Sequence, residues 1–440
     1  MGSETLAALM FPLLFLFVFL GVPVAFALIA TAFLMAMPAF GSLASLQIYN
    51  QIQNTASQLL LTAVPAFVFM GVMLEASGIS ERLFRAMQVW MGRLPGGLSL
   101  ATMTMAAIIA ASTGIVGAVE VVIGVMAIPI MMRNGYNKSL ISGTICAGGS
   151  LGTMIPPSIV VVIYAAISQQ SVGKLFAAVL FPALIMVALF LGYILARAIL
   201  KPEDAPRAVE EEPIPLFEKL KITATGMVPA AALIVAVLGA ILLGVATPTE
   251  AASVGALGAL ILTVLYGRFS WAVLYDTLER TLKINCMILL IVAGGNMFAG
   301  IFRLHRGNEL VQDIVSSLDL TAFGVVGALL LIVFIAGFIL DWVSVVLITL
   351  PIFLPILAQF EIDEIWFATV MIVVIQTSYL TPPMAPSIFY LRSIAPASIT
   401  FGDMYKGVLP FIICQIIVLV LVMVFPELAT YLPSQLQSYE

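Results

Sequence analysis

Two pairs of adjacent prolines interrupt long apolar stretches of this chain. The first lies in GGSLGTMIPPSIVV, residues 148–161, and the second in TSYLTPPMAPSIFY, residues 377–390. Proline has no backbone N–H and clashes with the preceding helical turn, so each pair should break a helix. Inside a bilayer, irregular backbone persists only within protein or along a watery cavity. Carbonyl oxygens freed at such a break can coordinate cations, and the N-terminus of the next half-helix can face an anion.

The first break is surrounded by oxygen atoms that suit a hard cation. Ser150, Thr153 and Ser158 add hydroxyl oxygens, and the neighbouring glycines allow positive φ. Sodium should prefer oxygen ligands, as calcium and magnesium do. For one motif alone, a proline kink stabilised by neighbouring helices is an equal alternative. The recurrence of the motif in the second half favours ion or substrate binding.

A carboxylate precedes each break inside apolar sequence. Glu120 lies in AASTGIVGAVEVVIG, and Asp341 lies in FIAGFILDWVSVV. A charge buried in a membrane is costly, so both side chains are candidates for a functional role. The alternative for each is a charge at a membrane boundary that water can reach. Arg392, just past the second break, could meet a substrate carboxylate or snorkel to the interface, and the sequence favours neither.

Three further polar residues have simpler interpretations. Glu250 follows a Thr-Pro-Thr turn, where an acid in the first helical turn suits the helix dipole and indicates capping. Glu75 opens onto a polar loop and is interpreted as a boundary residue. His305 lies in the polar turn RLHRGNE, and a solvated loop position is expected for it.

The elements that must position these residues are membrane helices. Charged residues make up 9% of the 440-residue chain, against about 25% in a soluble domain. Long apolar windows recur throughout, and the length leaves room for roughly 10–12 crossings of about 20 apolar residues each. The fold class is therefore an all-α polytopic membrane protein. A net charge of −5 argues against nucleic acid as a partner.

A charged, proline-rich linker at residues 201–221 divides the chain nearly in half. The halves, residues 1–200 and 222–440, share short matches in the same order at separations of 222–228 residues, which predicts an internal repeat. Each half holds one pair of broken-helix motifs: 110–124 with 148–161, and 334–346 with 376–392. Inverted halves are a common plan in transporters, although the helix count that distinguishes inverted from parallel halves is not fixed by the sequence. Basic residues around the linker predict that it is cytoplasmic.

Four stretches together resemble a known family. They are GTICAGGSLGTMIPPSIVVVIYA, GVATPTEAASVGALGAL, GFILDWVSVVLITLPIFLPIL and QTSYLTPPMAPSIFYLRSIAP. Over nearly its whole length, the chain resembles the large membrane subunit (DctM-type) of tripartite ATP-independent periplasmic transporters, called TRAP transporters.

This resemblance implies a multi-pass protein of the bacterial inner membrane that is a transporter rather than an enzyme. It implies a scaffold and an elevator-type transport domain with two re-entrant helical hairpins. The implied function is sodium-coupled import of a small organic acid or zwitterionic solute. The implied partners are a small membrane subunit (DctQ-type) and a periplasmic substrate-binding protein. Sodium is the coupling ion, and no organic cofactor is expected.

The resemblance also implies the residues of two sodium sites. The first would use Thr113, Gly152, Ile155 and Pro157, largely through backbone oxygens, and the second would use Gly337, Asp341, Ser378 and Thr381. For the substrate, we expect contacts from Glu120, Ser150, Ser158, Asp341, Trp342 and Arg392.

The chain departs from the family pattern at a few positions. Ser378 and Ala385 stand where many relatives have glycine, so a side-chain oxygen of Ser378 could replace a backbone ligand. Glu120 stands where an uncharged residue is more usual, and we hypothesise that it pairs with the cation of a zwitterionic substrate.

Three other functions compete with this interpretation. A stand-alone sodium-coupled elevator carrier of organic anions, without a binding protein, is the first alternative. An intramembrane enzyme is disfavoured because the sequence has no metal-binding motif with histidine and no Ser-His pairing. A channel remains possible in principle, but two broken-helix repeats with acids fit a carrier better.

Overall fold

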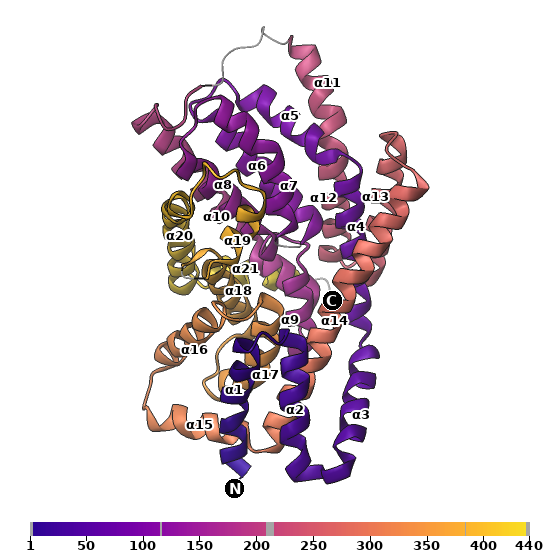
Figure 1. The fold of residues 1–440 in the computed structure, drawn as a ribbon, viewed down its shortest axis with the longest axis vertical. Coiled ribbons are helices and arrows are strands. Elements are labelled where there is room, and N and C mark those ends of the chain that lie inside the picture. Colours follow the sequence, from indigo (N-terminus) through magenta and orange to yellow (C-terminus); the bar gives the residue numbers. More distant parts are fainter. Residues whose placement is uncertain (1–2, 115–116, 208–214, 383, 437–440) are drawn as a thin grey trace.

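The computed structural model describes residues 3–114, 117–207, 215–382 and 384–436, and within these ranges the secondary structure is helical (Figure 1). The helices of the first half are α1 (Ser3–Phe19), α2 (Val24–Phe40), α3 (Ala44–Ala56), α4 (Ala63–Ala76), α5 (Ile79–Met91), α6 (Gly97–Thr113), α7 (Ala118–Arg133), α8 (Lys138–Ser150), α9 (Ile159–Ser168) and α10 (Val172–Leu200). Those of the second half are α11 (Leu216–Gly226), α12 (Val228–Leu242), α13 (Pro248–Leu265), α14 (Trp271–Leu304), α15 (Gly307–Ser317), α16 (Ala322–Ala336), α17 (Trp342–Gln359), α18 (Glu364–Leu380), α19 (Pro386–Ile394), α20 (Phe401–Val424) and α21 (Glu427–Leu436). Short 3₁₀ turns, η1 (Gly41–Leu43), η2 (Leu59–Thr62) and η3 (Leu151–Thr153), join some of them.

Membrane-spanning helices confirm the polytopic class. Among the described residues, seven helices are long and apolar enough to cross a bilayer, or eight if the bent pair α11–α12 counts as one span. Several other apolar helices have only 10–17 residues, which is shorter than the roughly 20 residues that a complete crossing needs. Two of these, α9 and α18, belong to interrupted pairs, so the described residues hold fewer full-length spans than the roughly 10–12 that the chain length allows.

The order of elements repeats in the two halves. In the first, α6 and α7 pack against each other, α8 and α9 are separated by a break, and α10 follows. In the second, α16 and α17 pack against each other, α18 and α19 are separated by a break, and α20 follows. The repeat predicted from short sequence matches is therefore present as a repeat of helices.

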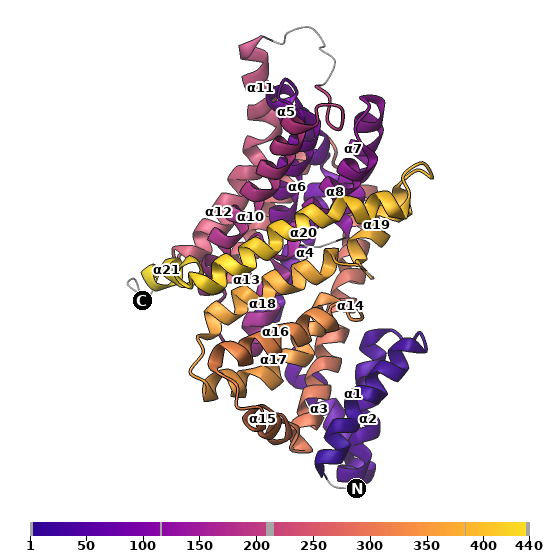
Figure 2. The same ribbon diagram turned by 90° about the vertical axis from the view of Figure 1, so that its left-hand side faces the viewer.

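The two halves are inverted relative to each other. Figure 1 shows the α6–α7 pair in the upper part of the molecule and the α16–α17 pair in the lower part. The preceding helices follow the same rule, because α5 lies near the top and α15 near the bottom in both Figure 1 and Figure 2. Each pair is a re-entrant hairpin whose tip reaches the middle of the molecule.

The motif at residues 110–124 has a different form from the one that the sequence suggested. It was expected to be a broken helix, but its described residues are the end of α6, the beginning of α7 and the turn flanks Gly114 and Gly117. The same holds for residues 334–346 at the tip of α16–α17. Each half thus combines one hairpin tip with one interrupted helix. Part of the second proline pair, Pro383, lies outside the described residues.

The helices pack in two groups. In the first group, α13 packs on α4, α2 packs on α14, and α12 packs on α13. In the second group, α8 packs on α6 and α20, and α18 packs on α16 and α20. The groups meet where α14 contacts α17 and where α4 contacts α6. The hairpins and interrupted helices all belong to the second group.

Side-chain caps explain where the interrupted helices begin. The Asn137 side chain accepts a hydrogen bond from the Ser139 N–H at 2.9 Å and begins α8. Asp363 accepts one from the Trp366 N–H at 2.7 Å and begins α18. Such residues satisfy N–H groups that a helix leaves unpaired at its start. The interrupted helices α8 and α18 therefore begin with the same kind of side-chain cap in both repeats.

The first part of the linker is anchored to the protein. Asp204 accepts a hydrogen bond from the Asn137 side chain at 2.8 Å and pairs with Arg197 at 3.0 Å. The Ala205 carbonyl accepts from the Gly96 N–H at 3.3 Å. Residues 208–214 of the predicted linker lie outside the described part of the chain.

Two of the simpler interpretations can be compared with the structure. Glu250 caps α13, because its carboxylate accepts from the Thr247 N–H at 2.8 Å, as the sequence predicted. The prediction for His305 was wrong: its side chain is buried, and Nε2 lies 2.8 Å from the Met35 carbonyl oxygen. A histidine in a polar turn was expected in solvent, but packing of α14 against α2 encloses it.

Candidate functional site

The first hairpin tip lies directly against the first helix break. Gly114 adopts φ +59° at the end of α6, and a Cβ atom at this position would lie 2.9 Å from the Pro157 carbonyl oxygen. Thr113 is buried and packs against α4, where a Cβ at Gly71 would lie 2.7 Å from the Thr113 Cα. The hairpin tip and the helix break therefore contact each other through their backbones, and only glycine fits at position 114.

The first break presents carbonyl oxygens that the helix cannot use. Pro156 and Pro157 have no N–H, so the carbonyls four residues earlier, of Gly152 and Thr153, lose their helical partners. The Thr153 carbonyl instead accepts a hydrogen bond from the Ser158 hydroxyl at 2.7 Å. The Gly152 carbonyl has no such replacement among the described hydrogen bonds. The break therefore leaves a backbone oxygen that a ligand could use.

The four residues expected for the first sodium site lie on these two elements. Thr113 ends α6, Gly152 belongs to η3, and Ile155 and Pro157 lie in the break before α9. Since η3 packs against α6, the structure brings the set into one region. Three of the four are buried, and Ile155 is partly exposed.

The second hairpin tip meets the second break in the same way. A Cβ at Gly337 would collide with the side chain of Ser378, so these two residues pack directly against each other. Thr381 ends α18, and its hydroxyl donates to the Thr377 carbonyl at 2.6 Å. The structure thus brings Gly337, Ser378 and Thr381 to neighbouring elements at the predicted second site.

Asp341 begins the second arm of this hairpin. Its carboxylate accepts hydrogen bonds from the N–H groups of Val343 at 3.1 Å and Ser344 at 3.3 Å. The Ser344 hydroxyl donates to the same carboxylate at 2.5 Å. Asp341 remains partly exposed, and so does the adjacent Trp342. Asp341 is therefore the N-cap of α17, and its carboxylate is held by Val343 and Ser344.

Glu120 is fully enclosed and has its own partners. Its side chain is 0% exposed, and its carboxylate accepts from the Gly117 N–H at 2.6 Å and from the Ser387 hydroxyl at 2.8 Å. A Cβ at Gly149 would collide with the carboxyl group. Glu120 therefore fastens the first hairpin to α8 and to α19 of the other half. None of the described pockets is lined by it.

The centre of the second helix group joins equivalent positions of the two repeats. The Gln376 side-chain N–H donates to the Ser150 hydroxyl at 3.3 Å, across 226 residues of sequence. This separation equals that between the two proline pairs, so the contact lies at the axis that relates the halves. Both side chains are 0% exposed. Ser150 also donates to the Ala147 carbonyl at 2.8 Å.

The remaining residues expected to bind substrate lie in different surroundings. Ser158 is buried and bonds within the first break. Arg392 donates to the Ile399 carbonyl at 2.9 Å, and its guanidinium lies 5.4 Å from the centre of the Phe401 ring. Arg392 thus fastens the loop between α19 and α20.

Sequence reasoning missed two polar residues of this region. Ser387 links Glu120 to α8, because its hydroxyl also lies 3.1 Å from the Cys146 carbonyl oxygen. Gln376 has a side-chain oxygen that is buried without a described hydrogen-bond partner. A glutamine inside the apolar run VMIVVIQTSYL was the available signal for the second of these.

Comparison with known proteins agrees with this arrangement of hairpins and breaks. The chain is 30% identical over 386 residues to the C4-dicarboxylate TRAP transporter large permease protein of Pseudomonas aeruginosa, covering 87% of this chain and 88% of that protein. It is 29% identical over 432 residues to the ectoine/5-hydroxyectoine TRAP transporter large permease protein of Ruegeria pomeroyi, covering 97% and 98%. Among solved structures, the fold is similar to that of the Alcanivorax borkumensis YdaH transporter, with a TM-score of 0.59, 15% identity and coverage of 87% and 88%.

A family-level match spans most of the sequence. Residues 11–428 match the family described as tripartite ATP-independent periplasmic transporter, DctM component. The many apolar helices and the named permease relatives agree with a multi-pass protein of the inner membrane that is not an enzyme. The chain belongs to the DctM-type large permease subunits of TRAP transporters.

Proposed function

We propose that this permease subunit imports a small organic acid or zwitterionic solute by coupling its movement to sodium. The observation that carries the proposal is the pairing of each hairpin tip with a helix break near the middle of the molecule. In both pairs a glycine of the tip packs against the break: Gly114 faces Pro157, and Gly337 faces Ser378. Oxygen-rich interrupted backbone at this depth is the arrangement that ion-coupled carriers use.

Two sodium ions would bind at these pairs. Thr113, Gly152, Ile155 and Pro157 would hold the first ion, mostly through carbonyl oxygens. Gly337, Asp341, Ser378 and Thr381 would hold the second. Hard cations prefer oxygen ligands of this kind. The Ser378 hydroxyl donates to the Ile375 carbonyl at 2.8 Å, which leaves its lone pairs available to an ion.

The substrate would bind beside the second ion. Asp341 and Trp342 are partly exposed at the start of α17, whereas Glu120 is enclosed by Gly117 and Ser387. This geometry supports a positioning role for Glu120 and disfavours the hypothesis that it pairs with a substrate cation. Ser150 and Ser158, which lie at the first break, would line the inner side of the substrate site.

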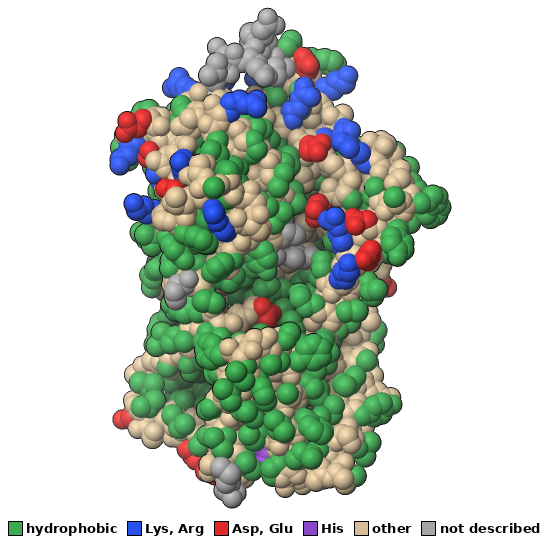
Figure 3. All heavy atoms as spheres, in the orientation of Figure 1, with side chains coloured by type: hydrophobic (Ala, Val, Ile, Leu, Met, Phe, Trp, Pro, Cys, Tyr) green, Lys and Arg blue, Asp and Glu red, His purple; other side chains and the backbone are tan. Residues whose placement is uncertain are grey.

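The basic residues support an orientation in the membrane. Figure 3 shows Lys and Arg side chains gathered in the upper part of the molecule on the face it displays. This end includes α5, α11 and the end of α10, which carry the following residues: Arg82, Arg85, Arg197, Lys219 and Lys221. Short basic loops remain in the cytoplasm, so the upper end would be cytoplasmic and the lower end periplasmic. The predicted cytoplasmic linker agrees with this orientation.

The movement would be of the elevator type. The hairpins and interrupted helices pack together as one group, whereas α4, α13 and α14 belong to the other. Sliding the second group, which holds the hairpins and interrupted helices, along the first group would carry both ion sites across the bilayer. A DctQ-type small subunit would extend the stationary group, and a periplasmic binding protein would deliver the substrate to the lower end. The family name describes a tripartite system, which supports both partners.

The test is uptake into proteoliposomes that hold this chain, its small subunit and the cognate binding protein. An inward sodium gradient should drive accumulation of an organic acid or a zwitterion, and only when the binding protein is present. Uptake without the binding protein would favour a stand-alone carrier. Uptake that follows a proton gradient and ignores sodium would contradict the proposal.

A further inference from the structure

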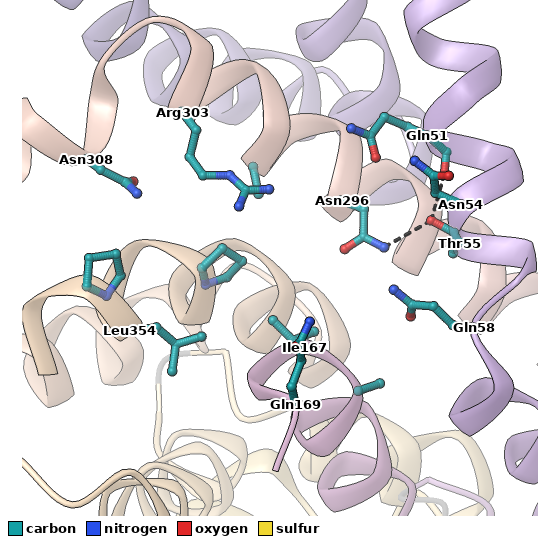
Figure 4. Close-up of a pocket in the computed structure, with 14 residues that line it drawn as sticks. Gln51, Asn54, Thr55, Gln58, Ile167, Gln169, Asn296, Arg303, Asn308 and Leu354 are labelled. Carbon is teal, nitrogen blue, oxygen red and sulfur yellow. Dashed lines mark hydrogen bonds between the residues drawn. The ribbon is translucent and has the colours of Figure 1, made fainter. Parts of the chain in front are cut away.

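A polar pocket lies apart from the hairpin tips, at the lower end of the molecule. It has a volume of about 340 Å³ and lies between α3 and α14 on one side and α9, α15 and α17 on the other (Figure 4). Pockets for small ligands commonly start near 300 Å³. The pocket spans the contact between the two helix groups, where a solute would arrive before it reaches the tips.

The charge of this pocket is positive. Among the described lining residues, Arg303 is the single cation and no carboxylate is present. Figure 4 shows the Arg303 guanidinium reaching from α14 into the space above α17. No ion pair of Arg303 is found in the described part of the chain, whereas Arg306, three residues later, pairs with Glu309. An unpaired guanidinium in a pocket is suited to a carboxylate, which it can bind with two parallel hydrogen bonds.

The rest of the polar lining consists mainly of amides. Asn296 donates to the Thr55 hydroxyl at 3.0 Å, which fixes the direction of its amide group. The side-chain oxygen of Asn308 is buried and has no described hydrogen-bond partner. Gln58 and Gln169 face the same space from the connection between α3 and η2 and from the end of α9 (Figure 4). Amides offer both donors and acceptors, so they suit hydroxyl, keto or amide groups of a ligand.

We infer that this pocket is an outer binding subsite for the carboxylate end of a small polar acid. Arg303 anchors the carboxylate, and the amides hold the remaining polar groups. This inference deepens the proposed function and rests on it, because it names where the imported solute first binds and which chemical group is recognised. A zwitterion with a carboxylate satisfies the same anchor.

Protection of an introduced cysteine tests the subsite without any transport. Asn54 lines the pocket from α3 and is exposed, so Asn54→Cys gives a thiol that a maleimide can reach. The adjacent Gln53→Cys is exposed but does not line the pocket, and it serves as the control. Both are made in a Cys286→Ser background, because Cys286 is the exposed native cysteine. Purified protein in detergent is labelled with succinate, pyruvate, ectoine or uncharged glycerol present.

The expected result is slower labelling of Asn54→Cys with at least one of the three acids, and no change with glycerol or at Gln53→Cys. Adding Arg303→Gln should raise the half-protecting concentration at least about tenfold, since a hydrogen-bonded charge pair is lost. Arg303→Lys should have a smaller effect, and Arg306→Gln should have none.

Two results would overturn the subsite. One is labelling that no acid slows, and the other is protection that survives Arg303→Gln unchanged. The proposed function fails in a different way, through the absence of sodium-driven uptake by the wild-type protein. Because labelling needs neither sodium nor a membrane, the two failures are distinguishable.

Discussion

The two hairpins place a carboxylate at the start of their second arm, but they use it differently. In α17, Asp341 is the N-cap residue and binds the N–H groups of Val343 and Ser344. In α7 the N-cap is Gly117, and Glu120 folds back three residues to bind the Gly117 N–H. Glu120 and Asp341 each precede a helix break, but they do not occupy equivalent positions in their helices. The helix starts instead pair Gly117 with Asp341.

The two carboxylates therefore differ in exposure and in how far their contacts reach. Asp341 uses local partners and stays partly exposed. Glu120 reaches across to Ser387 in the other half and is 0% exposed. We propose that these two positions divide between transport and assembly, with Asp341 serving transport and Glu120 serving assembly. The following predictions test that division, from the largest expected effect to the smallest.

Asp341→Asn should abolish sodium-driven uptake while leaving the fold intact. Asparagine is as good an N-cap as aspartate, so the thermal unfolding midpoint should change little, whereas the charge available to sodium is lost. Uptake in proteoliposomes and thermal unfolding in detergent measure the two quantities. Normal uptake by this variant would place the essential charge elsewhere.

Gly337→Ala should destabilise the second site by about 1–3 kcal/mol, because the added methyl group collides with the Ser378 side chain. Ser378→Gly removes that side chain, so the double variant should recover most of the loss. Thermal unfolding of the wild type, both single variants and the double variant gives the coupling between the two positions. Purely additive effects would mean that tip and break do not touch.

Gly149→Ala should destabilise the protein by a similar 1–3 kcal/mol, because the new methyl group collides with the Glu120 carboxyl group. Gly192→Ala in α10 is the matched control, since nothing lies within 4 Å of its added Cβ, and it should be neutral or stabilise slightly. A stable Gly149→Ala protein would show that Glu120 is free to move away.

Glu120→Gln should leave substrate affinity and sodium dependence unchanged, because the amide oxygen can still accept from Gly117 or Ser387. Glu120→Ala leaves the Gly117 N–H unpaired, although the Ser387 hydroxyl can still donate to the Cys146 carbonyl, and it should cost about 1–3 kcal/mol of stability. The half-saturating concentration of a zwitterionic substrate is the informative measurement. A large rise in that concentration for Glu120→Gln would restore the hypothesis of a substrate contact.

Gln376→Leu combined with Ser150→Ala should have the smallest effect, within about 1 kcal/mol. Replacing both partners of a buried hydrogen bond by apolar groups can be nearly neutral, and the Gln376 oxygen has no described partner to lose. Thermal unfolding measures the change. A loss of several kcal/mol would show that this contact holds the halves together.

Much of the fold could be predicted from the sequence. Proline pairs and flanking glycines identify the breaks because those residues change backbone chemistry directly. The caps Asn137 and Asp363 are also local signals. The hairpins were harder, since glycines such as Gly114 and Gly117 can either flank the ends of two separate helices or lie in one kinked helix. Only the packing of α6 against α7 distinguishes them.

The sequence predicted part of the candidate site. The residues grouped by family resemblance do lie on a hairpin tip and its adjacent break, because both motifs of each half can be located along the chain. Contacts between the halves, such as Glu120 with Ser387 and Ser150 with Gln376, depend on how the repeats fold onto each other. Arg303 belongs to a pocket shared by five helices, and no short motif encodes that arrangement.

The most direct test of the central claim compares the sodium dependence of uptake in three proteins. Wild type, Asp341→Asn and Glu120→Gln are reconstituted with the small subunit and the binding protein, and uptake is measured against external sodium. The account predicts a steep sodium dependence for wild type and Glu120→Gln, and no sodium-driven uptake for Asp341→Asn. Sodium-dependent uptake that survives Asp341→Asn and is lost in Glu120→Gln would contradict it.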